Sequence, residues 1–176
     1  MLRGEVAGLR ARDDSDVPVL HAELHDDVAT WVTADSRPWR PIPASAESPF
    51  RAAGPRDDSA IFSVVQLATG DLAGQALLWG VDVHNRLAHV GISLRPAFRG
   101  CGLGADTVRV LCRYGFAILG LQRLQIETLA SNAAMIATAA RAGFVPEGTL
   151  RQSAWVDGQF ADEVILGLLA RDWHPA

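Results

Sequence analysis

Residues 90–105, VGISLRPAFRGCGLGA, decide the fold of this chain. An apolar run that predicts a buried strand ends at Pro96, a glycine-spaced loop follows, and a helical pattern begins near Gly104. Glycines at alternate positions leave the loop without side-chain bulk, so its backbone N–H groups can converge on an oxyanion. The helix N-terminus adds the positive end of its dipole. The stretch therefore predicts a strand, an anion-binding loop and a helix.

The remaining chain supplies a sheet and helices around this loop. Apolar and alternating runs predict strands at 6–9, 60–67, 72–81, 87–94, 123–129, 144–150 and 163–169. Periodic segments with capping residues predict helices at 15–25, 26–34, 103–119 and 131–142. This order predicts an α/β (α+β) fold with a mixed, mostly antiparallel sheet of six to seven strands and about four helices. We expect one domain over residues 1–176.

Composition narrows the function classes. The formal charge is −4, so we expect no nucleic-acid partner bound through a broad basic face. All 16 basic residues are Arg and none is Lys, which we interpret as genome composition bias. The two cysteines, Cys101 and Cys112, indicate no disulfide framework. Without a signal-like start or an apolar run of about 18 residues, we expect a cytoplasmic protein with no membrane role.

A proline-rich segment interrupts the pattern between residues 35 and 59, where five prolines exclude regular helix and central strand. Long loops in compact domains are often binding loops, and Trp39 and Phe50 give this one apolar anchors. Trp39 is our candidate for substrate binding. The alternative is a loop that two buried aromatic side chains hold in place without contacting a ligand.

His21 and His25 are predicted to lie one turn apart on the same helical face. Two histidines at this spacing can reach one zinc ion, but the sequence offers no evident third ligand. We interpret them as solvated surface histidines and predict no metal site.

Three kinds of glycine loop compete for residues 90–105. A phosphate-binding P-loop needs a lysine, and this chain has none. Gly100-x-Gly102-x-x-Ala105 matches a relaxed dinucleotide-binding pattern. Its context is wrong, because the approaching strand belongs to an antiparallel meander and no acidic residue stands at the expected spacing.

The third kind fits. The segment resembles the signature of the GNAT superfamily of acyl-CoA-dependent N-acyltransferases, Arg/Gln-x-x-Gly-x-Gly/Ala, which Arg99, Gly102 and Gly104 match. The resemblance continues through Asn132 and residues 141–148, RAGFVPEG, and covers roughly residues 87–173. Within this superfamily, the sequence is most similar to the RimJ/RimL-type branch, which acetylates protein N-terminal amines and, in relatives, small amines.

The resemblance implies acetyl-CoA as cosubstrate and no metal. It assigns the coenzyme pyrophosphate to backbone amides of Arg99, Gly100, Cys101, Gly102, Leu103, Gly104 and Ala105. It pairs Leu94 with the pantetheine arm and brings Asn132 into contact with that arm; the alternative for Asn132 is an ordinary helix cap. A backbone N–H among Ile92, Ser93 and Leu94 would hold the oxyanion.

His89 is the favoured base for deprotonating the amine, directly or through water, because the family often places Glu at this point of the strand. The alternative is a half-buried histidine with a structural hydrogen bond. Glu127 on the next strand is the second candidate, although the branch places its own Glu at the position of Gln125. The alternative for Glu127 is a solvated strand residue.

The acid that protonates the coenzyme thiolate is missing. The superfamily tyrosine falls at Ala139 and the branch's serine at Met135, and neither can donate a proton. Tyr114 is predicted to lie in the core, and Cys101 has no visible base partner. Water could protonate the thiolate, activity could be slow, or the domain could bind acyl-CoA without efficient turnover.

We therefore predict an acetyl-CoA-dependent N-acetyltransferase whose acceptor is a primary amine, either a peptide N-terminus or a small molecule, attacking directly in a ternary complex. The alternative is a catalytically weak acyl-CoA-binding regulatory module. The resemblance also implies a bacterial cytoplasmic protein and makes a homodimer an expectation.

Overall fold

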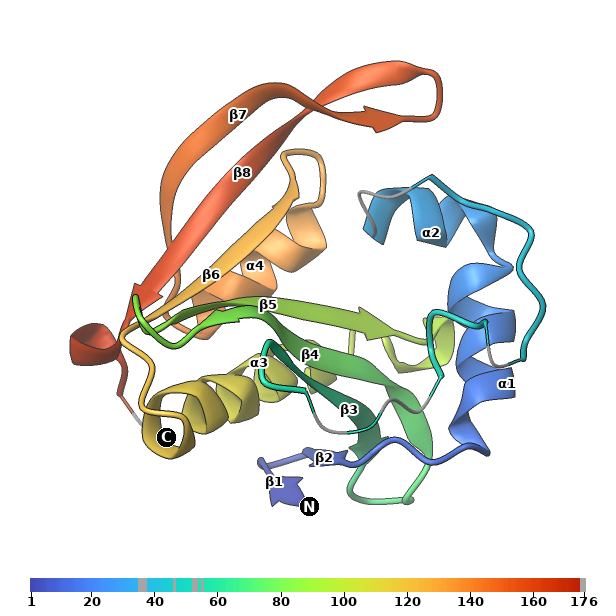
Figure 1. The fold of residues 1–176 in the computed structure, drawn as a ribbon, viewed down its shortest axis with the longest axis horizontal. Coiled ribbons are helices and arrows are strands. Elements are labelled where there is room, and N and C mark those ends of the chain that lie inside the picture. The colour runs from blue at the N-terminus through green and yellow to red at the C-terminus, as the bar shows by residue number, and fades with distance from the viewer. Residues whose placement is uncertain (35–37, 46, 52–53, 55, 175–176) are drawn as a thin grey trace.

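One sheet organises the protein (Figure 1). The computed structural model describes residues 1–34, 38–45, 47–51, 54 and 56–174. The strands lie side by side in the order β1-β2-β3-β4-β5-β6-β8-β7. They are β1 (Leu2–Arg3), β2 (Ala7–Arg10), β3 (Ser59–Gln66), β4 (Leu72–Asp82), β5 (Leu87–Leu94), β6 (Arg123–Leu129), β7 (Val145–Val156) and β8 (Gln159–Leu169). The predicted mixed sheet is confirmed. It has eight strands because the two-residue β1 pairs with β2.

Neighbouring strands in this sheet run antiparallel except β5 and β6, which are parallel. The crossover between those two strands contains the glycine loop and the helix that follows it. A parallel pair needs such a long connection, whereas the antiparallel pairs β3–β4, β4–β5 and β7–β8 follow one another through short turns. The predicted meander before the glycine loop is therefore confirmed.

Helices cover both faces of the sheet. They are α1 (Asp16–Leu20), α2 (Val28–Ala34), α3 (Leu103–Arg113) and α4 (Ala133–Arg141), with single π-helical turns η1 (His21–His25) and η3 (Tyr114–Ile118) and short 3-10 turns η2 (Pro96–Phe98) and η4 (Ala170–Asp172). On β3, the core residue Val64 faces one way and the buried Ser63 the other. Ser63 bonds Asp16 of α1, so α1 lies on the face opposite the main core. Among the described residues, no helix is long and apolar enough to span a membrane.

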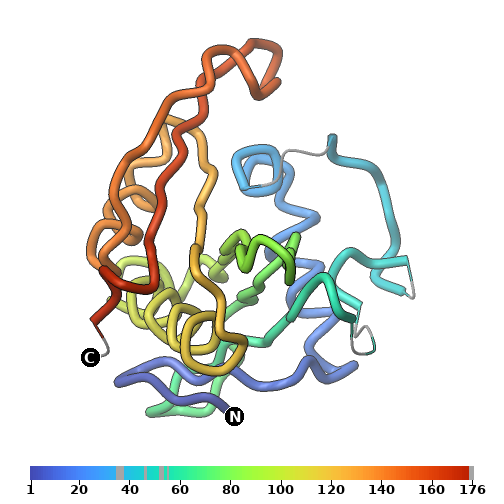
Figure 2. Tube along the Cα trace, turned by 60° about the vertical axis from the view of Figure 1, so that its left-hand side comes forward, coloured from blue at the N-terminus to red at the C-terminus, as the bar shows by residue number. Residues whose placement is uncertain are grey.

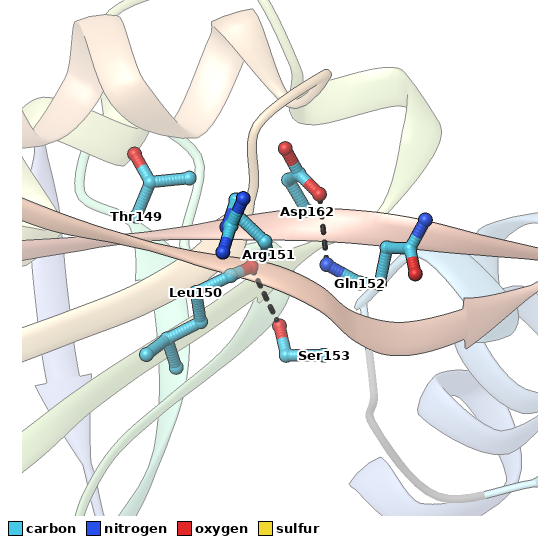
Figure 3. Close-up of a pocket in the computed structure, with 6 residues that line it drawn as sticks. All are labelled: Thr149, Leu150, Arg151, Gln152, Ser153 and Asp162. Carbon is cyan, nitrogen blue, oxygen red and sulfur yellow. Dashed lines mark hydrogen bonds between the residues drawn. The ribbon is translucent and has the colours of Figure 1, made fainter.

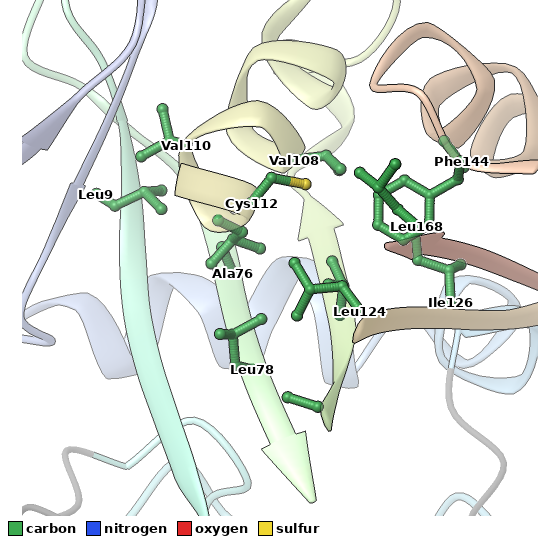
Figure 4. Packing of buried hydrophobic residues seen from close by; sticks show 14 of the residues in the cluster. Leu9, Ala76, Leu78, Val108, Val110, Cys112, Leu124, Ile126, Phe144 and Leu168 are labelled. Atoms are coloured by element: carbon green, nitrogen blue, oxygen red, sulfur yellow. The ribbon is translucent and has the colours of Figure 1, made fainter. Parts of the chain in front are cut away.

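The main core lies between the sheet and α3. Val108 and Cys112 of α3 pack among Ala76, Leu78 and Leu124 of the strands (Figure 4). All five side chains are completely buried. Burial of each leucine contributes roughly 1.5–3 kcal/mol. This packing fixes the start of α3, and with it the glycine loop, relative to β5.

A long hairpin forms the far edge of the sheet. Strands β7 and β8 extend past the end of β6 in both views (Figures 1 and 2). Asp157-Gly158, which lies between the last two predicted strands and is a typical hairpin-turn sequence, forms the turn. Both residues have positive φ, 46° and 83°, as a two-residue hairpin turn requires. The predicted strands at 144–150 and 163–169 are too short. Their outer halves are mostly exposed, and β7 contains bulges, so they lack the alternation on which the prediction depended.

The outer bulge of β7 opens a hollow on the hairpin (Figure 3). There the backbone N–H of Gln152 donates to Asp162 Oδ1 at 2.8 Å, and Ser153 Oγ donates to the carbonyl of Leu150 at 3.1 Å. These bonds hold the bulge in shape. The hollow is lined by Thr149, Leu150, Arg151, Gln152, Ser153 and Asp162, none of which was a predicted site residue.

Candidate active site

The parallel strands β5 and β6 separate part-way along their length. In the described structure they pair at three positions, Leu87 with Arg123, Ala88 with Leu124 and His89 with Gln125. Beyond His89, β5 stays paired with β4 as far as Leu94, while β6 stays paired with β8. The two strands therefore diverge from a common apex, and the gap between them opens toward the glycine loop.

Backbone donors of β5 point into this gap. The N–H of Arg95 bonds the carbonyl of Ala73 on the β4 side at 2.9 Å. Residues along an antiparallel strand direct their hydrogen bonds alternately to its two sides. The N–H groups of Ile92 and Leu94 therefore point toward β6, and that of Ser93 points toward β4. Of the three predicted oxyanion donors, Ile92 and Leu94 have the required direction, and the backbone of Ser93 does not.

The glycine loop has the backbone that an anion cradle needs. Gly100 and Gly102 have φ of 75° and 87°, a left-handed conformation that L side chains rarely adopt. No atom lies within 4 Å of where a Cβ would stand at either position, so the space beside the loop is open. Gly102 directly precedes α3, whose first N–H groups have no partners within the helix. The loop therefore offers backbone donors at a helix N-terminus to an anion.

Other loop residues hold this backbone in place. The Nε of Arg99 donates to the carbonyl of Leu94 at 2.8 Å, which ties the loop to the end of β5. The exposed Cys101 has its sulfur 3.2 Å from the carbonyl of Phe98. Leu103 and Ala105 are buried in the core, so only their backbone could meet a ligand.

Asn132 caps α4. Its side-chain oxygen accepts from the N–H of Met135 at 3.1 Å, and its amide donates to Thr128 Oγ1 at 3.0 Å. The predicted start of this helix at Ser131 is therefore one residue early. The capping alternative is observed, while the contact between Asn132 and the pantetheine arm stays a prediction.

His89 and Glu127 lie together at the apex of the gap. His89 Nδ1 is 3.5 Å from Glu127 Oε1, and their side chains are 20% and 32% exposed. The residues beside them in the strands, Ala88 and Ile126, are buried in the main core. Because side chains alternate across a strand, His89 and Glu127 lie on the opposite face of the sheet. The structure thus brings both predicted catalytic residues to one point.

Trp79 is a member of this cluster that sequence reasoning missed. It pairs with His89 across β4 and β5, and the two rings stack with centroids 4.1 Å apart and planes 21° apart. Trp79 remains 42% exposed. The available signal was the register of the β4–β5 hairpin, which places Trp79 directly opposite His89.

The prediction of solvated histidines was wrong. His21 and His25 are 1% and 0% exposed, because residues from α2 and from the segment after it fold over η1. Phe50 and the half-buried Trp39 belong to this second cluster. Trp39 Nε1 donates to the carbonyl of His25 at 2.9 Å. The structure thus gives Trp39 an anchoring contact, and its contact with a substrate stays a prediction.

Hydrogen bonds to the segment after α2 engage both ring nitrogens of His21. Its Nε2 lies 2.8 Å from the carbonyl of Ile42, which can only accept, and so carries a proton. Its Nδ1 lies 2.9 Å from Ser48 Oγ. Donor atoms of His21, His25 and Asp26 lie within 4.8 Å of one another, but a protonated Nε2 has no lone pair for a metal.

Comparisons with known proteins agree with this geometry. The family model "Acetyltransferase (GNAT) domain" matches residues 8–145. The chain belongs to this GNAT family. The separating strands and the glycine loop are therefore those of a GNAT domain, and the resemblance found in the sequence is confirmed.

Relatives of this GNAT chain carry acetyltransferase names. The protein provisionally named ribosomal N-acetyltransferase YdaF, from Bacillus subtilis (strain 168), is 35% identical over 61% of this chain and 59% of its own length. The chain thus matches about three fifths of that curated relative. A spermidine N-acetyltransferase from Vibrio cholerae, in complex with CoA and spermine, has a TM-score of 0.78 at 18% identity, covering 96% and 98% of the two chains. RimL, a ribosomal L7/L12 alpha-N-protein acetyltransferase in complex with CoA, has a TM-score of 0.74 at 21% identity, covering 96% of both.

This GNAT chain lacks a side-chain proton donor at the two positions where the resemblance expects one. Ala139 is completely buried, and Met135 packs against the main core. Tyr114 also packs on the core, edge-on to Phe62 with ring centroids 5.2 Å apart. It lies in η3, beyond the end of α3 away from the glycine loop.

Proposed function

We propose that this chain is an acetyl-CoA-dependent N-acetyltransferase that transfers an acetyl group to a primary amine. The observation that carries the proposal is the His89–Glu127 pair at the apex of the gap between β5 and β6. An imidazole beside a carboxylate, next to inward-pointing backbone donors, supplies a base and an oxyanion site together. Membership of the GNAT family supports the same activity.

The glycine loop is the proposed coenzyme site. Backbone N–H groups from Arg99 to Ala105 would bind the pyrophosphate, and the open space beside Gly100 and Gly102 supports this. The exposed edge of β5 at Leu94 would pair with the pantetheine arm, and Asn132 would flank it. CoA in the related structures named above supports this assignment.

His89 would act as the base. Its Nδ1 is buried without a hydrogen-bond partner among the described residues and lies 3.5 Å from Glu127 Oε1, which leaves Nε2 to accept a proton from the incoming ammonium group. The neutral amine would attack the acetyl carbonyl directly in a ternary complex, and the N–H of Ile92 would stabilise the oxyanion. Such a donor contributes roughly 2.7–4 kcal/mol in measured hydrolases. The leaving thiolate would take its proton from water or from protonated His89.

The acceptor would approach from the face that carries Trp79 and Glu127. The exposed indole and the carboxylate both favour a cationic group. Peptide N-termini and small polyamines share this chemistry, and the names of an alpha-N-protein acetyltransferase and a spermidine acetyltransferase among the similar proteins support it. Trp39 is proposed as a further substrate contact. A cytoplasmic location and association into a homodimer also remain predictions.

Release of free thiol from acetyl-CoA tests the proposal. The full chain is mixed with acetyl-CoA and a panel of N-terminal peptides and polyamines, and each product is identified by its mass. We expect thiol release that depends on the amine, with one added acetyl group on the acceptor. Coenzyme binding without release for any amine would contradict it.

A weak acyl-CoA-binding module is the second candidate. Buried Ala139 and core-packed Met135 favour it, because neither can protonate the thiolate. This candidate predicts acetyl-CoA binding with turnover far below the usual range of about 1–1000 per second. A turnover number within that range would eliminate it.

A further inference from the structure

A row of polar side chains runs along one face of the sheet and ends at His89. It begins on β7, where Glu147 lies in the inner bulge. Arg123 of β6 donates from Nη1 to Glu147 Oε1 at 2.9 Å, and its Nη2 bonds the other carboxylate oxygen. The same Nη2 donates to Gln125 Oε1 at 2.8 Å. A guanidinium and a carboxylate thus anchor one end of the Gln125 amide.

The other end of that amide reaches the catalytic pair. Gln125 Nε2 donates to Glu127 Oε1 at 2.6 Å. This is the oxygen that lies 3.5 Å from His89 Nδ1. Gln125 also pairs with His89 in the β5–β6 register, at the last position before the strands diverge. Gln125 therefore connects the anchored arginine to the carboxylate at the apex.

Chemistry permits one orientation of this amide. A guanidinium only donates hydrogen bonds and a carboxylate only accepts them, whereas the amide does each at one end. Arg123 must therefore take the oxygen of Gln125, and Glu127 must take the nitrogen. The reverse orientation would place donor against donor and acceptor against acceptor. The row is directional, and Glu127 cannot swing away without losing its bond to Gln125.

The distant end of the row fits closely against the backbone. A Cβ at Gly167 of β8 would stand 2.3 Å from Glu147 Oε1, so this carboxylate lies directly over the glycine. The hydrogen bond from Arg123 lowers the pKa of Glu147, which keeps Glu147 ionised at neutral pH. Arg123 therefore pairs its charge with Glu147.

We propose that Gln125 is a positioning residue that holds the Glu127 carboxylate against His89 Nδ1. Glu127 then fixes the imidazole tautomer with hydrogen on Nδ1 and the lone pair on Nε2. The inference rests on the proposed function for the catalytic use of Nε2, but the orientation itself can be measured without catalysis. Among the described residues, Glu127 of β6 is the charged group beside His89, and β4 supplies the uncharged Trp79 ring that stacks on it.

Nitrogen NMR of the full chain with ¹⁵N-labelled histidine tests the orientation. His89 is one of five histidines and is assigned with a His89→Gln variant. Gln125→Met keeps the side-chain length but removes the donor to Glu127. The matched control is Gln122→Met, because Gln122 is exposed and directly precedes β6.

In the wild type and in Gln122→Met, we expect His89 to carry its hydrogen on Nδ1. In Gln125→Met, we expect a mixture of tautomers, because the oriented carboxylate is lost. An unchanged tautomer in Gln125→Met would overturn the proposal, whether or not any amine is acetylated.

A double-mutant cycle separates positioning from general support of the fold. Gln125→Met should lower kcat by about tenfold or more in the wild type and have no further effect in Glu127→Ala. An equal fold-decrease in kcat with and without Glu127 would mean that Gln125 supports the structure of β6 and does not act through Glu127. Absence of activity in the wild type would contradict the proposed function and leave the NMR result to decide the role of Gln125.

Discussion

Replacement of Gly102 by alanine isolates the backbone of the glycine loop. A methyl group at Gly102 meets no atom within 4 Å, so steric clash contributes nothing. The free-energy cost of the substitution comes from the backbone dihedral φ of Gly102, which is 87°. An L-residue pays roughly 1–2 kcal/mol for a left-handed conformation. Gly104 is the matched control, because a methyl group there makes ordinary contacts of 3.6–3.7 Å with Thr138 and Ile92, without a positive φ.

The strain in Gly102→Ala should appear in coenzyme binding. Gly100, Cys101 and Gly102 are exposed, so the free loop can relieve the strain by moving. A ligand that needs the left-handed form must restore it. At about 1.4 kcal/mol for each factor of ten, the dissociation constant for CoA should rise about 5- to 30-fold.

Isothermal titration with CoA measures this effect, and thermal unfolding of each free variant checks the fold. Gly104→Ala should bind within about threefold of the wild type. If Gly102→Ala binds CoA as tightly as the wild type and is equally stable, then the left-handed loop is not the coenzyme site.

Three further predictions concern stability. Arg10 and Ser63 bond the nearly buried Asp16, and although burial opposes its ionisation, these bonds lower its pKa to about 2. Ionised Asp16 contributes about 2 kcal/mol to the free energy of unfolding. This contribution is complete above the unfolded pKa near 4 and is lost as the pH falls toward 2. In urea unfolding, Asp16→Asn should therefore lose less stability than the wild type across that pH range. Asp106, 3% exposed, accepts two backbone N–H bonds at 2.8 Å, and Asp106→Ala should lower the free energy of unfolding by about 2–4 kcal/mol, whereas a change below about 0.5 kcal/mol would contradict this role. Phe50→Ala should cost about 3–5 kcal/mol in the same assay because Phe50 is 2% exposed, and unchanged unfolding would show that this cluster does not support the fold.

Local signals predicted the parts of the fold that depend on neighbouring residues. The alternating glycines predicted a loop without side-chain bulk, and no atom lies within 4 Å of where a Cβ would stand at Gly100 or Gly102. Asp157-Gly158 is a typical hairpin-turn sequence, because both positions of such a turn need a positive φ. The GNAT motif predicted the crossover between β5 and β6, and that arrangement brought His89 beside Glu127.

Contacts between distant segments could not be predicted from the residues themselves. His21 is buried because Ile42 and Ser48, more than 20 positions away, bond both of its nitrogens. Nothing in the periodicity of residues 15–25 indicates that a later segment of the chain buries His21. The outer halves of β7 and β8 carry mostly exposed or half-buried residues around the buried Ala154, so no hydrophobic alternation marked them as strands.

The row that ends at His89 was missed for a related reason. Gln125, Arg123 and Glu127 alternate along β6 and read as ordinary solvated strand positions. Their connection depends on Glu147, which a bulge in β7 places beside Arg123. Only the register of three strands reveals the order of donors and acceptors.

In the proposed function, His89 deprotonates an amine beside acetyl-CoA bound in the gap between β5 and β6. This role is tested by kcat for acetyl transfer by His89→Gln, with the dissociation constant of acetyl-CoA measured on the same protein. We predict a fall in kcat of about 10²- to 10⁴-fold with unchanged acetyl-CoA binding. A variant that retains the wild-type rate at every pH would contradict this role of His89.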